Sequence, residues 1–448
     1  MRAQGEYDES SSTYRSTLSQ NLKATPGQPN KEPMHIPITL GLIGQRNEKP
    51  LPLTLQGENA RGPTERVLEL TGESQEFIFE GIEEKPVLSL GHNFSAPAHF
   101  HDGNGRTERA YLMRHATDSF NRWEAGQKLS SEIALEMIGD IQADRSPAVD
   151  KHYLDAIGAV IARSNASRPG NENTFEDPGF TAQILMPPSE NELALAMNPI
   201  DPEAIHAARN ELILSVTSAH RTEIEKLYAA NSSDGPFSPN AEAAGKRSLR
   251  NATLRYLTAS GDGKAGEFAY EHYRLATNMT DMMAGLSALA RIGGAPAERA
   301  LDDFHRRFEK NSLVLDKWMG VQAMSPQPTT VERVRDLMKH RAFSIENPNR
   351  VRALIGAFAN ANPLRFHDKS GSGYRLVAEI IRKLDAINPQ TAARMATAFE
   401  SWRKYDAERQ HLMKAELESI AAGTQKSGKP ISANLFEIVS KILGTNAP

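Results

Sequence analysis

The 448-residue chain contains no cysteine, few aromatic residues (6%) and no long apolar run. Without thiols, disulfide scaffolds and thiolate zinc sites are excluded. A membrane-spanning helix needs about 18 or more largely apolar residues in succession, and no stretch of the sequence approaches that. The amino-terminal sequence MRAQGEYDESSS is acidic and polar, unlike the basic and then apolar start of a signal peptide. We therefore expect a soluble, cytoplasmic protein with no membrane partner.

The usual catalytic motifs are missing as well. A zinc peptidase needs HExxH, in which two histidines one helical turn apart bind the metal and the glutamate acts as a base. The sequence contains no HExxH, no P-loop, no dinucleotide-binding glycine fingerprint and no strand leading into GxSxG. His99 and His101 have no third ligand near them in the sequence, and His367 followed by Asp368 is explained by a capped turn. We predict no catalytic residue and no metal ligand in this chain.

Positive charge is concentrated in one part of the chain. Residues 303–414 hold 20 Lys and Arg against 12 Asp and Glu, although the whole chain carries a net charge of −4. Such a basic surplus can face nucleic acid, the acidic end of a peptide, or only water. Composition alone leaves these three readings open.

The first part of the chain, residues 1–103, is predicted to form a small all-β domain. Six short segments of strand-like alternation follow one another and are separated by turns that contain Gly, Pro and Asn. Regular short strands with such turns are typical of an Ig-like β-sandwich. The six segments are residues 12–22, 35–44, 51–57, 64–70, 75–82 and 86–94.

From residue 104 to residue 448 the apolar residues follow helical spacing instead. Residues 108–129 have apolar positions at helical spacing, and many further helices are joined by short breaks. We expect an α-helical superhelix of stacked helix pairs, although no crisp repeat period is visible. Residues 164–191, rich in Asn, Pro and Gly, are predicted to form one long irregular connection.

Several helix starts are marked by capping residues. Thr329 with Glu332 matches the T-x-x-E capping box. Elsewhere an Asp or Asn that can accept the first backbone N–H groups stands before a proline, which suits the first helical position. These pairs are Asp201-Pro202, Asn347-Pro348 and Asn388-Pro389.

Two of these helices present cations. In the helix that starts at Pro348, an apolar stripe (Val351, Leu354, Ile355 and Phe358) faces the core. Arg352 lies beside this stripe with Gly356 one turn later, so its side chain is free to reach outward. In the helix that starts at Pro389, Met395, Phe399 and Trp402 define the buried face. Gln390 and Arg394 share another face, one turn apart.

The remaining conspicuous residues are expected to serve the fold. Arg350 would be structural, Tyr374 would fill a helix junction, and Trp123, Trp318 and Trp402 occupy apolar positions of helices. From the residues alone, Arg352 and Arg394 could equally cap helix ends or pair with acidic neighbours such as Asp385 or Glu346.

Long segments of the chain resemble the C-terminal half of bacterial aminopeptidase N. That enzyme belongs to the gluzincin-type metallo-aminopeptidase family. The resemblance runs from about Tyr14 to the last helix, and its segments occur in the expected order. They include LMRHATDSFNRWEAGQ (112–127), HRAFSIENPNRVRALIGAF (340–358), NPLRFHDKSGSGY (362–374) and KYDAERQHLMKAELE (404–418).

The resemblance implies a four-domain parent protein, of which this chain looks like the last two domains. The zinc site would lie in an upstream catalytic domain of the same polypeptide, which releases N-terminal amino acids from peptides. We then expect a truncated fragment that is inactive alone, holds no cofactor and self-associates through its exposed domain interface.

The family's pattern also assigns substrate-binding residues. Gln390 would help line the pocket for the first side chain of the peptide, and Arg352 and Arg394 would bind its distal carboxylate or its backbone. A guanidinium suits this task because it stays charged and can bind a carboxylate through two parallel hydrogen bonds. The alternative is a free-standing helical-repeat adaptor that binds an acidic protein or RNA.

Overall fold

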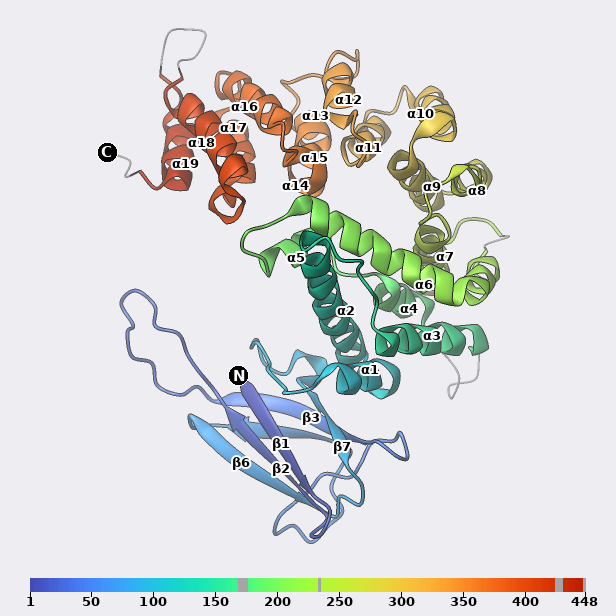
Figure 1. Cartoon of the computed structure of the whole chain (residues 1–448), viewed down its shortest axis with the longest axis vertical. Coiled ribbons are helices and arrows are strands. Elements are labelled where there is room, and N and C mark those ends of the chain that lie inside the picture. The colour runs from blue at the N-terminus through green and yellow to red at the C-terminus, as the bar shows by residue number, and fades with distance from the viewer. Residues whose placement is uncertain (168–175, 233–234, 424–429, 446–448) are drawn as a thin grey trace. The chain divides into compact units, whose positions relative to one another are not determined.

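The first seven elements of the computed structural model are strands arranged in two antiparallel sheets (Figure 1). One sheet has the order β1-β2-β6-β4 and the other the order β5-β3-β7. The structure describes residues 1–167, 176–232, 235–423 and 430–445. The strands are β1 (Arg2–Asp8), β2 (Thr13–Ser19), β3 (Ile36–Gly44), β4 (Thr54–Leu55), β5 (Glu65–Leu70), β6 (Ser74–Glu80) and β7 (Pro86–Leu90).

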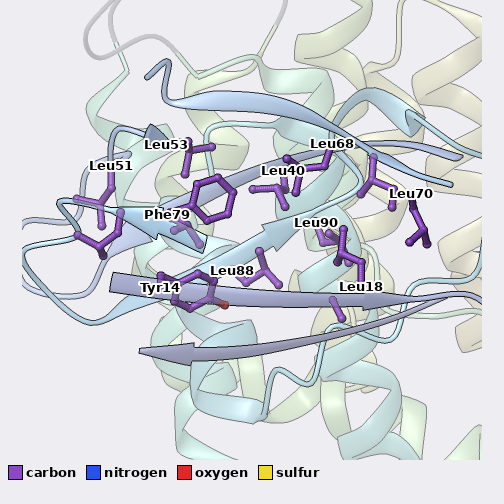
Figure 2. Close-up of a cluster of buried hydrophobic side chains, with 14 residues drawn as sticks. Tyr14, Leu18, Leu40, Leu51, Leu53, Leu68, Leu70, Phe79, Leu88 and Leu90 are labelled. Atoms are coloured by element: carbon purple, nitrogen blue, oxygen red, sulfur yellow. The ribbon is translucent and has the colours of Figure 1, made fainter. Parts of the chain in front are cut away.

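The core of the sandwich lies between the two sheets. Leu18 and Phe79 come from one sheet and Leu40 and Leu88 from the other, and all four are buried. Figure 2 shows these side chains gathered between the strands. Because successive side chains of a strand point to opposite faces, the alternation in the sequence places one set of each strand in this core.

The predicted sandwich is confirmed, with two differences in its strands. Each of the six predicted segments contains a strand, but only Thr54–Leu55 of segment 51–57 is paired as one. Strand β1 was not predicted. It buries only Ala3, so its sequence lacks apolar alternation, and it is held by its register with β2, in which Tyr7 lies opposite Tyr14.

Helices fill most of the rest of the chain. Residues 108–129, whose apolar spacing is helical, belong to two helices that are separated by a break at 116–118. Asp118 marks the start of the second helix, because its carboxylate accepts the Asn121 N–H at 2.8 Å, as an N-terminal cap does. The first helices are α1 (Arg106–His115), α2 (Ser119–Gln142), α3 (Lys151–Ala166), α4 (Pro178–Leu185) and α5 (Glu190–Leu195).

The prediction of one irregular connection over 164–191 is wrong for part of that range. Helix α3 extends to Ala166, and Asp177 caps α4 by accepting the Phe180 N–H at 2.6 Å. Residues 168–175 lie outside the described residues. By internal contacts the chain divides into two units: residues 1–133 with 148–187, and residues 134–147 with 188–448.

Within the second unit, helices that follow one another in sequence pack together, as expected for a superhelix (Figure 1). Examples are α6 with α7, α8 with α9 and α16 with α17. No helix in the described part of the chain combines the length and the apolar character needed to cross a bilayer. The helices are α6 (Pro202–Ala230), α7 (Ala241–Leu257), α8 (Gly263–Leu275), α9 (Met279–Ile292), α10 (Gly294–Phe308), α11 (Ser312–Ala323), α12 (Thr330–Leu337), α13 (Pro348–Val351), α14 (Ala357–Ala361), α15 (Pro363–Phe366), α16 (Ser372–Asp385), α17 (Pro389–Ala396), α18 (Ala407–Ala421) and α19 (Ala433–Leu443).

Three of the four predicted helix caps are confirmed. The side chains of Asp201, Asn347 and Asn388 each accept backbone N–H groups of the following turn. The capping box at Thr329 is wrong, because its side chain makes no capping hydrogen bond. Thr330 is buried instead, and its hydroxyl donates to the Ser325 carbonyl at 2.8 Å.

Candidate functional site

Helix α17 holds Gln390 and Arg394 on its exposed face. Asn388 begins the helix by accepting the Thr391 N–H at 3.0 Å, and Pro389 occupies the first turn. The opposite face is buried through Met395 and continues into Phe399, as predicted. This burial fixes the rotation of the helix, so Gln390 and Arg394 point away from the core and are exposed.

Arg352 lies on the other predicted helix, which is continuous from Pro348 to Ala361. Its middle, Arg352–Gly356 (η2), is wound more widely than an α-helix, with hydrogen bonds five residues apart. The predicted apolar stripe is fully buried: Val351, Leu354, Ile355 and Phe358. The Arg352 Cγ atom lies 3.5 Å from the place that a Cβ atom on Gly356 would take. The arginine stem therefore crosses the bare surface of this glycine, as the sequence predicted.

Neither Arg352 nor Arg394 forms an ion pair with any residue that the structure describes. Of the two acidic neighbours considered from the sequence, Asp385 accepts hydrogen bonds from Ser432, and Glu346 forms no ion pair within the described part of the chain. As far as the described residues go, the two exposed guanidinium groups thus keep their N–H donors available for a ligand.

Arg350 behaves differently, as predicted. Its side chain is buried, lies 2.8 Å from a carboxylate oxygen of Asp316 and donates to the Ser312 carbonyl at 3.2 Å. These contacts join α13 to α11, so Arg350 serves the fold.

The three predicted site residues are only partly brought together. Gln390 and Arg394 are neighbours on α17, one turn apart. Arg352 belongs to a different helix, and within the described residues no hydrogen bond or ion pair joins it to the other two. Their assignment as one substrate-binding set stays a prediction.

A cluster of three further arginines was not predicted. Arg209 on α6, Arg255 on α7 and Arg291 on α9 lie within electrostatic range of one another. Burial, and then repulsion by neighbouring arginines, lowers the pKa of Arg255 to about 9 and of Arg291 to about 10. Each arginine lies on a different helix, so their proximity follows from the packing of the helices and could not be predicted from the sequence.

His367 is part of a buried polar network. Its two ring nitrogens lie 3.0 Å from the Tyr374 hydroxyl and 2.8 Å from the Tyr405 hydroxyl. Burial, followed by the positive charge of Arg409, lowers the pKa of His367 to about 3. A neutral, enclosed imidazole holds helices together, and Tyr374 fills this junction as predicted.

The three tryptophans differ in burial, and the two histidines that were considered as metal ligands lie at the surface. Trp318 and Trp402 are buried as predicted, whereas Trp123 is only half-buried. His99 and His101 are exposed. In the part of the chain that the structure describes, no group of three or more His, Asp or Glu side chains is placed to hold a metal ion.

Two domain families match the chain, the first over its β-sandwich and the second over its helices. Residues 1–103 match the family described as "Domain of unknown function (DUF3458) Ig-like fold". Residues 106–444 match "Domain of unknown function (DUF3458_C) ARM repeats". The chain therefore belongs to this family of Ig-like and ARM-repeat domains.

Its relatives include aminopeptidases. Aminopeptidase N of Caulobacter vibrioides is 39% identical over 366 residues, which are 82% of this chain and 40% of that protein. Aminopeptidase N of Escherichia coli is 34% identical over 438 residues, 98% of this chain and 48% of that protein. A crystal structure of Legionella pneumophila aminopeptidase A in complex with aspartic acid superposes with a TM-score of 0.79 at 26% identity, over 99% of this chain and 48% of that one.

These matches define the chain more closely. It is homologous to the C-terminal part of aminopeptidase N and spans about half the length of the curated relatives it matches. The resemblance drawn from the sequence is confirmed. The adaptor alternative gains no support from these relatives, which are aminopeptidases.

Proposed function

We propose that this chain is the noncatalytic C-terminal portion of a zinc-dependent aminopeptidase N, which caps the active-site chamber and controls the access of peptides. The observation that carries the proposal is the alignment of 98% of the chain with 48% of an aminopeptidase N. Zinc and the catalytic residues would belong to an upstream domain of the same polypeptide.

Within this function, Arg352, Arg394 and Gln390 contact the peptide substrate. The exposure of all three and the lack of ion pairs at both arginines among the described residues support this role. A structural arginine is usually paired with a carboxylate, as Arg350 is with Asp316. A guanidinium that is left unpaired can bind the carboxylate of a peptide without first breaking another contact.

The first test concerns the chain by itself. Purified chain is assayed with alanyl and leucyl chromogenic amides, with and without added zinc. We expect no hydrolysis, because the sequence holds no HExxH and the described residues hold no cluster of metal ligands. Robust zinc-dependent turnover by the purified chain would overturn the proposal.

The second test concerns the arginines and uses the chain joined to its upstream zinc domain. Arg352→Gln and Arg394→Gln should each raise KM for short peptides with a free carboxylate by roughly tenfold, the value of one charge-assisted hydrogen bond. Peptides with an amidated C-terminus should show a smaller change. Arg341→Gln is the matched control, because Arg341 is an exposed arginine that is already paired with Glu309. If all three variants had the KM of the unsubstituted protein, a contact between these arginines and the substrate would be excluded.

A further inference from the structure

A pocket of about 210 Å³ lies in the first unit of the structure, and its lining includes none of the predicted peptide contacts. Its wall is formed by the loop after β3 and by helices α1, α2 and α3. Two aliphatic side chains of α3 form the apolar part of this wall. The charged and titratable residues that line it are Glu48, Arg114, His115, Arg122 and Arg163.

The three arginines of this pocket outnumber their carboxylate partners. Arg122 and Arg163 both pair with one buried carboxylate, that of Glu176, and Arg122 holds both of its oxygens at 3.2 Å. Arg114 donates its Nε–H to the Ala110 carbonyl at 3.2 Å. Its two terminal nitrogens have no partner among the described residues. Among the described residues, the guanidinium of Arg114 therefore has no carboxylate partner in the pocket.

His115 contributes an imidazole to the same wall. Its Nε2 atom is buried and has no hydrogen-bond partner among the described residues. Its ring packs against Tyr111 in a tilted arrangement, with 4.6 Å between the centroids. Burial lowers the pKa of His115. Glu48, whose carboxylate lies 3.7 Å from Nδ1, acts in the opposite direction.

The charges that face this imidazole are positive on balance. Arg114 on α1, Arg122 on α2 and Arg163 on α3 all lower the pKa of His115, and only Glu48 raises it. Three guanidinium groups around one pocket repel one another unless an anion lies between them. A ligand with negative oxygens in this pocket would compensate the free end of Arg114.

The geometry points to a binding site for a small oxyanion, a carboxylate or a phosphate, in this pocket. Guanidinium groups recognise both through paired N–H···O bonds. The volume lies below the roughly 300–1,000 Å³ of pockets for drug-sized ligands, so the ligand is small. Because none of the lining residues belongs to the predicted peptide contacts, this site stands or falls independently of the proposed function.

The experiment uses the 448-residue chain and follows the imidazole resonances of His115 by NMR. Inorganic phosphate and malonate are titrated separately, and sodium chloride serves as a control for ionic strength. We expect saturable shifts of His115 and an increase in its pKa, because a bound anion stabilises the protonated ring. Saturation by phosphate alone identifies a phosphate site, and saturation by malonate alone a carboxylate site. Shifts that chloride reproduces, or no shift by either anion, overturn the inference.

Variants separate binding from folding. Arg114→Gln removes the uncompensated guanidinium and should weaken binding at least roughly tenfold. Arg15→Gln is the matched control, because Arg15 is an exposed arginine of the same unit that pairs with Glu76 on the sandwich. Thermal melts check that both variants fold. If Arg114→Gln lowers the melting temperature, binding by folded Arg163→Gln protein decides the question. Unchanged affinity in both pocket variants contradicts the proposed site.

Discussion

At the scale of single residues, the guanidinium of Arg350 is buried against α11, whereas that of Arg352, two residues later, is exposed. The helical period explains the difference, since two residues correspond to a rotation of about 200°. Arg350 thus points toward Asp316, and Arg352 crosses Gly356 toward the surface. One helix supplies both a structural cation and one that is available to a ligand.

This contrast predicts unequal effects on stability. Arg350→Ala should lower the free energy of unfolding by about 3 kcal/mol, because it leaves the Asp316 carboxylate without its partner in a largely buried place. Arg352→Ala should change it by less than about 0.5 kcal/mol, as is usual for exposed positions. Urea denaturation of the two variants measures both values. Similar losses would mean that Arg352 also supports the fold and would weaken its assignment to substrate.

At the scale of secondary-structure elements, local signals were sufficient where the element is built locally. The caps at Asp201 and Asn388 and the buried stripe from Val351 to Phe358 follow from a few adjacent residues, and all were predicted. Strand β1 and the cluster of Arg255 with its neighbours were not, because they depend on pairing with distant segments. The same applies to the two sites: the exposed Arg352 and Arg394 were predictable from adjacent residues, whereas the separate pocket around His115 was not.

The confirmed cap at Asn388 and the missing cap at Thr329 can be compared experimentally. Asn388→Ala should lower the free energy of unfolding by about 1 kcal/mol, because the Thr391 N–H loses its acceptor at the start of α17. Thr329→Ala should cost less than about 0.5 kcal/mol, since this threonine makes no capping bond. Chemical denaturation of both variants under one set of conditions checks the difference. A larger loss for Thr329→Ala would show that the T-x-x-E motif does cap α12 in solution.

At the scale of the whole molecule, two buried neutral histidines link stability to pH. His272 lies between the Tyr228 hydroxyl at 2.8 Å and the Asp281 carbonyl at 3.1 Å, and burial lowers its pKa to about 4. His367, enclosed by its two tyrosines, has a pKa of about 3. In the unfolded chain both return toward about 6.5. Between these values only the unfolded state binds the protons, so the folded state loses stability as the pH falls below about 6.5.

The contribution of His367 can be isolated with one substitution. Each histidine that is protonated only in the unfolded state lowers the free energy of unfolding by about 1.4 kcal/mol per pH unit on acidification. At pH 7, His367→Gln should be less stable than the wild type, because it disturbs the hydrogen bonds to Tyr374 and Tyr405. The difference should shrink by up to that amount per unit as the pH is lowered from about 6 toward 4. Urea denaturation at several pH values gives both slopes, with the exposed His411→Gln as a control that follows the wild type. Parallel slopes for His367→Gln and the wild type would show that the folded protein protonates His367 over the same pH range as the unfolded chain. This result would contradict the lowered pKa of His367.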